Sequence, residues 1–270
     1  MNFKRAVILG ISIFLFTQAR EPKCALITGV SRGIGHALAE NLLRRGLFVV
    51  GVARQSPETC MKGLLAHPQF RYLSADLSSS AGLSALDHFI RENQYSFDII
   101  IHNAATIEPA YLQEAQAEAV ESLIGINLLA PIKLTHILAH SYRPYARIAC
   151  ISSGAATHPI VQLGAYCISK AGLLMFVRIL REEFIDRDIG IVSIIPGVVD
   201  THMQQVLRED LRGDIQAEFQ ALHDEKELIS PSTCADYIAW LVCDVPFKSF
   251  KQKALWDIGE KSGINRSILF

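Results

Sequence analysis

The amino-acid sequence predicts an α/β protein, a single domain built on a doubly wound parallel sheet of about seven strands with helices on both faces. From residue 23 onward, short β-rich runs alternate with stretches of helical periodicity. The β-rich runs are near-continuous apolar segments, as expected of strands buried between two layers of helices. No repeat, low-complexity tract or linker is evident in residues 21–270, which we interpret as one domain following an apolar segment, 1–20.

Each expected element rests on its local pattern. Short apolar runs predict strands, in order, at 24–28, 48–52, 70–74, 99–102, 148–152, 191–195 and 253–256. Helical periodicity predicts helices at 35–45, 81–93, 115–142, 165–186 and 232–243. The charged stretch 202–230 follows the carboxyl end of a strand, where ligands bind in such folds. It is either a helical insertion over the site or a solvated surface helix.

Composition excludes several classes of protein. Half of the 270 residues are apolar, which argues against a disordered chain. The 26 basic and 27 acidic residues leave a net charge of −1, so no basic field is present to attract nucleic acid, and no nucleic-acid partner is expected. The six cysteines are scattered without a C-x-x-C pair, which suggests neither a disulfide framework nor a zinc site and fits a reducing compartment.

A glycine-rich loop joins the first expected strand to the first expected helix. Residues 28–35 read TGVSRGIG, with the spacing G-x-x-x-G-x-G. Glycines permit a tight turn and a close approach to a pyrophosphate, and the helix amino terminus offers unpaired N–H groups. In this strand–loop–helix context the loop predicts dinucleotide binding by a Rossmann-type fold.

The charges beside this loop favour NADP over NAD. A carboxylate ending the second strand would bind the ribose hydroxyls and repel a 2′-phosphate, but that strand is followed by Arg54. Arg32 lies within the glycine-rich loop, and two guanidinium groups can bind one phosphate. Asp76, after the third strand, either accepts a hydrogen bond from the adenine amino group or caps the following helix.

Tyr166 and Lys170 are four residues apart in an expected helix and therefore share one face. The lysine charge is expected to lower the pKa of the phenol from about 10, which would make Tyr166 a proton donor to a carbonyl oxygen. Such a pair is common by chance, but Ser152 and Ser153 end a strand 13 to 14 residues earlier, and Asn127 lies in a long helical stretch.

Together, these pieces resemble the short-chain dehydrogenase/reductase family over residues 23–260. The matching features are the TGVSRGIG loop, Asp76-Leu77, the sequence His-Asn-Ala-Ala at 102–105, Pro196-Gly197, and the set Asn127, Ser153, Tyr166 and Lys170. They occur in the order and on the elements that the family requires.

The resemblance implies roles for individual residues. Tyr166 would be the general acid/base, and Lys170 would lower its pKa and hold the nicotinamide ribose. Ser153, favoured over Ser152, would position the substrate carbonyl, and Asn127 would support a water in a proton relay. The residues implied in NADP(H) binding are Gly29, Ser31, Arg32, Gly33, Ile34, Gly35, Arg54, Asp76, Leu77, Asn103, Ala104, Tyr166, Lys170, Pro196, Gly197, Val199 and Thr201.

One motif departs from the family pattern. The usual N-N-A-G reads His-Asn-Ala-Ala at 102–105. Ala105 adds a methyl group where the chain passes close to the cofactor, which could shift nucleotide affinity without abolishing binding. His102 is interpreted as a packed histidine at the end of a strand rather than as a catalyst.

Within the family, residues 151–172 and 196–205 are similar to benzil reductases and, less closely, to sepiapterin reductases. That subgroup reduces α-dicarbonyl compounds with NADPH, so a small carbonyl compound is the expected substrate. Asp257 occupies a place comparable to the carboxylate that anchors the pterin in sepiapterin reductases, although a structural role is the favoured interpretation because many family members carry an aspartate near this place. The apolar residues Ile160, Val161, Leu163, Val198, Val199 and Met203 suggest a hydrophobic substrate.

The amino-terminal segment leaves three interpretations open. Lys4 and Arg5 precede an apolar run at 6–16, which is too short to span a hydrocarbon core of about 30 Å. The segment is an export signal or a membrane-contacting anchor, an upstream extension, or an apolar arm on its own domain. Because the predicted cofactor is found mainly inside cells, the catalytic domain is expected in the cytoplasm.

Two other functions remain alternatives. One is a 3-oxoacyl or hydroxysteroid-type reductase, which would need a basic docking patch or a larger apolar pocket. The other is a non-catalytic NADP-sensing protein, which usually lacks the tyrosine or the lysine of the pair. The helical stretches 115–142 and 165–186 resemble the pair through which family members form homodimers or homotetramers.

Overall fold

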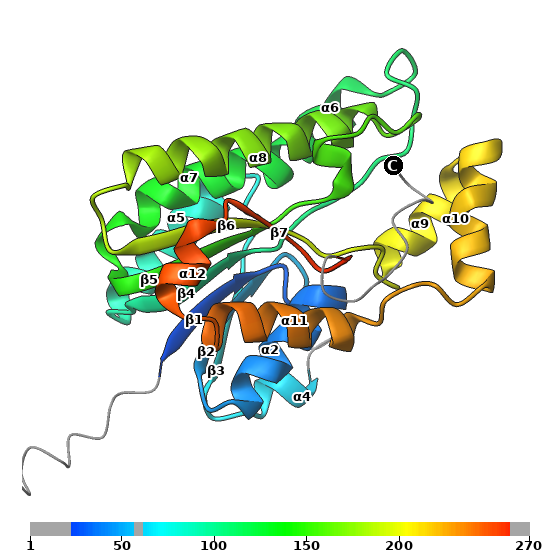
Figure 1. The fold of residues 1–270 in the computed structure, drawn as a ribbon. Coiled ribbons are helices and arrows are strands. Elements are labelled where there is room, and N and C mark those ends of the chain that lie inside the picture. Colours follow the sequence, from blue (N-terminus) through cyan, green and yellow to red (C-terminus); the bar gives the residue numbers. More distant parts are fainter. Residues whose placement is uncertain (1–22, 57–61, 260–270) are drawn as a thin grey trace, which may run out of the picture.

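The computed structural model describes residues 23–56 and 62–259. Its centre is a seven-stranded parallel sheet in the order β3-β2-β1-β4-β5-β6-β7 (Figure 1). The strands are β1 (Cys24–Thr28), β2 (Phe48–Ala53), β3 (Phe70–Ser74), β4 (Phe97–His102), β5 (Tyr142–Ile151), β6 (Ile189–Ile195) and β7 (Leu255–Asp257). The strand order reverses between β1 and β4, which is where ligands bind in doubly wound sheets. The predicted fold class is confirmed.

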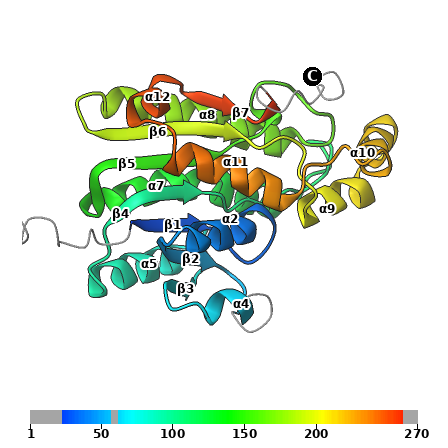
Figure 2. The same ribbon diagram turned by 60° about the horizontal axis from the view of Figure 1, so that its bottom comes forward.

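Helices cover both faces of the sheet (Figures 1 and 2). One face carries α5 (Ser80–Glu92), α7 (Ala130–Ile137) and α8 (Gly164–Glu183), and the other carries α2 (Gly33–Arg44) and α11 (Pro231–Cys243). A separate apolar core lies on each face. All five residues of β1 and all seven of β6 are buried, which explains why these strands are almost entirely apolar, with Thr28 and Ser193 as the polar exceptions.

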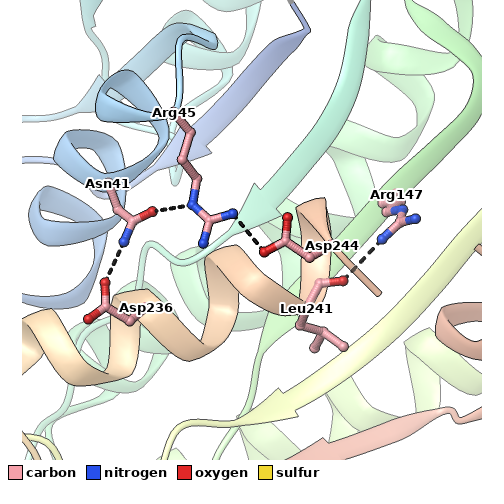
Figure 3. A network of polar contacts seen from close by, with 6 residues as sticks. All are labelled: Asn41, Arg45, Arg147, Asp236, Leu241 and Asp244. Carbon is pink, nitrogen blue, oxygen red and sulfur yellow. Dashed lines mark hydrogen bonds and ion pairs between the residues drawn. The ribbon is translucent and has the colours of Figure 1, made fainter. Parts of the chain in front are cut away.

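A polar network fixes α2 against α11 (Figure 3). The Asn41 side chain donates to Asp236 and accepts from Arg45 Nε at 2.9 Å. Arg45 also donates to Asp244 at 2.8 Å. Because α2 begins at the glycine-rich loop, this network helps to set the angle at which the loop meets the sheet.

The expected helix at 115–142 is divided in the structure. It comprises α6 (Ala117–Ile124), a π-helical turn (Gly125–Leu129), α7 and a 3-10 turn (Leu138–His140). The prediction was wrong at its end, because Tyr142 already belongs to β5 and pairs with Phe97. Residues 142–147 lack the apolar run that marks the rest of β5, so this extension could not be predicted from the local pattern. By length and composition the whole segment could cross a membrane, but its α7 part packs in the core on the sheet, as in soluble proteins.

The charged stretch 202–230 forms two helices at the carboxyl edge of the sheet, α9 (His202–Asp210) and α10 (Asp214–Asp224) (Figure 2). We call these two helices the cap. The interpretation as a helical insertion beside the site is confirmed. Short helices α4 (Lys62–Leu65) and α12 (Phe247–Gln252), and a 3-10 turn (Gly154–Ala156), were not expected. The apolar segment 1–20 lies outside the described residues.

Candidate active site

Every residue singled out for cofactor or substrate binding from the strand–loop pattern lies at, or shortly after, the carboxyl end of a strand. These residues follow β1 (Gly29, Ser31, Arg32, Gly33, Ile34, Gly35), β2 (Arg54), β3 (Asp76, Leu77), β4 (Asn103, Ala104), β5 (Ser153) and β6 (Pro196, Gly197, Val199, Thr201), and Asp257 ends β7. Tyr166 and Lys170 come from the first two turns of α8, and Asn127 from the π-helical turn. The fold thus gathers the predicted residues along one edge of the sheet.

The glycine-rich loop leaves no space for side chains at two positions. A Cβ atom at Gly35 would overlap the carbonyl oxygen of Gly29 and lie 2.5 Å from Asn103 Nδ2. At Gly29, which has a φ of +76°, a Cβ would lie 2.8 Å from Ala104 Cα. The backbone amides at the start of α2 therefore stay uncovered by side chains from the loop, as a pyrophosphate site requires.

Hydrogen bonds fasten this loop to the end of β4. Asn103 Nδ2 donates to the carbonyl oxygens of Thr28 and Gly29 at 3.0 and 3.1 Å. Thr28 Oγ1 accepts from the backbone amides of Asn103 and Ala104, both at 3.0 Å. Thr28 was not predicted to have a role, but it links the loop to the segment that the sequence assigned to cofactor binding.

The two arginines predicted to select NADP are both exposed, one after β1 and the other after β2, which are neighbouring strands. Within the described residues, neither Arg32 nor Arg54 forms a salt bridge. Asp76 Oδ1 accepts from the backbone amide and hydroxyl of Ser78. Burial would raise the pKa of Asp76, but these hydrogen bonds and the Arg54 charge hold it below its ordinary value.

The Asp76 side chain does not cap the amino terminus of α5, which was one of its two predicted roles. The N-cap of α5 is Ser79, whose hydroxyl accepts from Gly82 N at 3.0 Å. The neighbouring Leu77 is buried in the apolar core, so its side chain is a packing group, and any cofactor contact there would fall to its backbone. Ser31 is partly buried within the glycine-rich loop.

Tyr166 is buried, and its hydroxyl lies near the Ser153 side chain. Ser153 Oγ accepts a hydrogen bond from Ala155 N at 3.2 Å. Burial raises the pKa of Tyr166 to about 12, which outweighs the lowering by the nearby Ser153 hydroxyl. This direction differs from the expected one. The Lys170 ammonium lies 5.6 Å from the centre of the tyrosine ring and does not offset burial.

Lys170 is 3% exposed, and its Nζ donates to the carbonyl oxygen of Ile151 at 2.9 Å. Burial lowers the pKa of this lysine to about 8, against a small opposing effect of Cys150. A buried ammonium with one protein acceptor retains N–H donors for a ligand. Ribose hydroxyl groups would suit those donors.

Asn127 lies deep in the site and connects two elements. Its Oδ1 accepts from Thr106 N at 2.8 Å, and its Nδ2 donates to Thr106 O at 2.9 Å and to Ser169 Oγ at 3.1 Å. The side chain therefore ties the segment after β4 to the residue preceding Lys170. The π-helical turn around Asn127 is a distortion that often occurs at functional sites.

His102 is a packed histidine, as the sequence predicted. It is 5% exposed at the end of β4, and its Nδ1 has no hydrogen-bond partner in the described residues. Burial lowers the pKa of His102 to about 4, so the ring is neutral at physiological pH. An uncharged, enclosed ring is not placed to exchange protons with a substrate.

A cavity of about 210 Å³ opens over this edge of the sheet. It is lined by Ser153 and Tyr166 and by the predicted cofactor residues Ile34, Pro196, Gly197, Val199 and Thr201. Asp257 also lines it, while Asp257 Oδ1 accepts from Gly259 N at 2.8 Å. The expected apolar lining is present at Ile160, Leu163, Val198, Val199 and Met203. Val161 is the exception, because it is 63% exposed and lies outside the lining.

Several lining residues were missed by the sequence analysis. The cap supplies Gln204, Leu207, Phe219 and Leu222, and Glu227 follows it. The spacing of Gln204 and Leu207 on α9 could have indicated one buried helix face, on which a glutamine is unusual. Their contact with the site could not be inferred from that spacing.

Comparisons with known proteins agree with this arrangement. Residues 23–212 match the sequence profile of the family described as short chain dehydrogenase. A benzil reductase ((S)-benzoin forming) of Bacillus cereus is 34% identical over 229 residues, which cover 79% of this chain and 91% of the relative. The corresponding protein of Bacillus subtilis (strain 168) is 31% identical over 245 residues, with coverages of 87% and 98%. The structure of L-sorbose reductase from Gluconobacter frateurii, complexed with NADPH and L-sorbose, matches with a TM-score of 0.75 at 26% identity, over 88% of this chain and 95% of that one.

Proposed function

The chain belongs to the short-chain dehydrogenase family, and we propose that it is an NADPH-dependent carbonyl reductase acting on a small, uncharged ketone or α-dicarbonyl compound. The observation that carries the proposal is the juxtaposition of Ser153 and Tyr166 in a largely apolar cavity that Ile34 of the glycine-rich loop also lines. The benzil reductases among its relatives support an α-dicarbonyl substrate. We also propose that residues 21–270 form the reductase domain and that the apolar segment 1–20 is separate from it.

In this proposal Tyr166 donates a proton to the carbonyl oxygen, and Ser153 orients that oxygen by a hydrogen bond. A phenol whose pKa is raised by burial is protonated at neutral pH, which suits a proton donor. Lys170 holds the ribose hydroxyls with its remaining N–H donors, and Asn127 fixes the position of the lysine's helix. When bound, the reduced nicotinamide supplies the hydride that the carbonyl carbon accepts.

The proposed choice of NADP rests on Arg32 and Arg54. Both guanidinium groups are exposed beside the glycine-rich loop, and the residue that follows β2 is basic rather than acidic. The fit of a dinucleotide is supported by the close packing at Gly29 and Gly35, where a Cβ atom would collide with the loop backbone or with residues 103–104 and distort the loop. The L-sorbose reductase structure, which contains NADPH, is a related example.

The lining of the cavity favours a small neutral substrate over an acyl-carrier thioester or a steroid. Among its described lining residues the ionisable side chains are Tyr166, Glu227 and Asp257, and no lysine, arginine or histidine lines it. Two carboxylates without a cation would disfavour an anionic acyl-carrier substrate. Its volume of about 210 Å³ is below the roughly 300–1,000 Å³ of sites for drug-sized ligands, which disfavours a steroid. The intact Tyr166–Lys170 pair argues against a purely NADP-sensing protein.

We also propose that the protein forms a homodimer or homotetramer through α7 and α8. Apolar side chains are exposed along these helices and at the turn before α7: Leu129, Ile132, Ile168, Met175 and Ile179 are each 40–56% exposed. Exposed apolar side chains gathered on particular helices often mark an interface. Substitution Ile179→Glu should reduce the mass measured by light scattering to that of the monomer. An oligomer of unchanged mass would contradict this assignment.

The catalytic proposal is tested by following oxidation of NADPH, and separately of NADH, with benzil, a simple diketone and sepiapterin. We expect turnover that prefers NADPH and falls by a factor of about 10²–10⁴ in Tyr166→Phe, the range for loss of a general acid. Because Tyr166 is also expected to contact the cofactor, the Kd for NADPH is measured in this variant and turnover is compared at saturating NADPH. Tight NADPH binding without turnover of any carbonyl compound would refute the reductase assignment and favour a sensing role. Sepiapterin as the preferred substrate would instead support a pterin contact at Asp257.

A further inference from the structure

Gln204 is a polar side chain buried on the cap side of the cavity. It is 2% exposed, lies on α9 next to Met203, and lines the cavity that also contains Ser153 and Tyr166. Its Nε2 and Oε1 atoms are both buried and have no hydrogen-bond partner among the described residues. Buried polar atoms are nearly always paired, so an entire unpaired carboxamide requires an explanation.

Two other glutamines among the described residues do have hydrogen-bond partners. Gln162 is 5% exposed, and its side chain donates to Arg212 O at 2.9 Å and accepts from Arg212 N at 3.1 Å. Gln205, the next residue on α9, is exposed and donates to Glu209 at 2.7 Å. Gln204 differs from both because the residue lines the cavity, so a bound molecule is the available source of a partner once the enclosed carboxamide turns towards it.

We infer that Gln204 is a specificity-determining residue, which donates a hydrogen bond to a second oxygen of the substrate while Tyr166 and Ser153 bind the reacting carbonyl oxygen. This inference rests on the proposed function. The second oxygen belongs to the other carbonyl of an α-dicarbonyl compound. A carboxamide also accepts hydrogen bonds, so an α-hydroxy ketone would be recognised through its hydroxyl group.

The side chains around Gln204 on the cap side of the cavity are apolar, which makes its carboxamide selective. Met203, Leu207 and Phe219 line the cap side of the cavity and offer no strong hydrogen-bond donor. A ketone with one oxygen would leave the carboxamide unpaired, as it is in the present structure, whereas a dicarbonyl would satisfy its donor. Sites that hydrogen-bond a substrate group discriminate against analogues that lack it.

The test compares benzil with deoxybenzoin, which has the same two-ring skeleton but one carbonyl group. Both are assayed with the full chain and with Gln204→Leu, which has a similar size and no hydrogen-bonding group. Loss of one hydrogen bond is expected to lower kcat/KM for benzil by about threefold to tenfold. The value for deoxybenzoin should stay unchanged. Comparing each ketone with itself across the variants removes their different intrinsic reactivities.

Gln205→Leu is the matched control, since it makes the same replacement one residue further along α9 on the exposed side. It should leave both kcat/KM values unchanged. Gln204→Leu should not lower the melting temperature, because the leucine replaces a buried carboxamide that has no partner to lose. A lower melting temperature with equal losses on both ketones would assign Gln204 a structural role and overturn the inference.

A binding measurement separates this inference from the proposed function. Calorimetric titration of benzil and deoxybenzoin into the protein saturated with NADP⁺ reports ketone affinity without turnover. A Kd that rises for benzil alone in Gln204→Leu supports the inference, and an unchanged Kd overturns it. Weaker NADP⁺ binding in this variant would show that Gln204 contacts the cofactor, and this result would also overturn the inference. If the wild-type chain neither binds nor reduces benzil, the proposed substrate class fails and the inference fails with it.

Discussion

The glycine-rich loop and the cap both contribute residues to the cavity but differ in how tightly the chain constrains them. In the loop, a methyl group at Gly35 would overlap the backbone of Gly29, and Asn103 connects Gly29 to the end of β4. In the cap, two of nine residues of α9 and two of eleven of α10 are buried, and Gly213 between them has no atom within 4 Å of an added Cβ. The difference indicates that the fold fixes the cofactor side, while the substrate side is open to variation.

The sharpest test of this comparison is Gly35→Ala. Because the new methyl group must displace the Gly29 backbone, we expect a loss of about 3 kcal/mol or more in the free energy of unfolding, at the upper end for overpacking. NADPH affinity should fall as well. Gly63→Ala is the control, since Gly63 lies in helix α4 with nothing within 4 Å, and it should be neutral or slightly stabilising. Urea unfolding and cofactor titration of both variants provide the measurement; equal effects would contradict the comparison.

The same contrast explains which parts of the site could be predicted from sequence. The TGVSRGIG loop is recognisable because its geometry tolerates few alternatives at Gly29 and Gly35. The Tyr166–Lys170 pair was found from helical spacing, which is a local property. In the cap the sequence indicated helices but not which of their side chains line the cavity.

Three features escaped prediction because they depend on contacts between distant segments. The absence of a partner for Gln204 is visible only when every neighbouring segment is in place. The pKa of Tyr166 rises because burial, which the sequence does not report, exceeds the effect of nearby groups. The extension of β5 to Tyr142 follows from its pairing with Phe97 on β4, across an irregularity in register.

The burial of His102, at the end of β4 beside the glycine-rich loop, makes the stability of the protein depend on pH. Its pKa is lowered by burial from 6.5 to about 4, so the unfolded chain takes up a proton as the pH falls below 6.5 while the folded chain does not. The wild type should therefore lose about 3 kcal/mol of stability between pH 6.5 and 4. Relative to the wild type, His102→Asn should lack this loss. His88→Asn, at an exposed position on α5, is the control. Parallel wild-type and His102→Asn stability profiles would show that this edge of the sheet admits water.

A smaller effect, on cofactor affinity, is expected from removing the exposed positive charge of Arg54 beside the glycine-rich loop. Arg54→Ala should raise the Kd for NADPH by about tenfold, in keeping with loss of one charge-assisted hydrogen bond, and leave the Kd for NADH unchanged. Arg44→Ala removes an exposed arginine from the far end of α2 and should alter neither value. Fluorescence titration measures both constants. An equal loss for the two cofactors would show that Arg54 contacts a group common to them rather than the 2′-phosphate.

The smallest effect should occur in the cap, with Gly213→Ala. Gly213 has a φ of +73°, so alanine is strained there even though space is free. The strain can relax into an exposed loop, and we expect a cost of about 1 kcal/mol, at the lower end of the range for such backbone conformations. Hydrogen exchange should accelerate in α10 and remain unchanged in β1 and β6, which are entirely buried. If the strands also exchanged faster, the cap would be part of the cooperative core, and the substrate side would be as constrained as the glycine-rich loop.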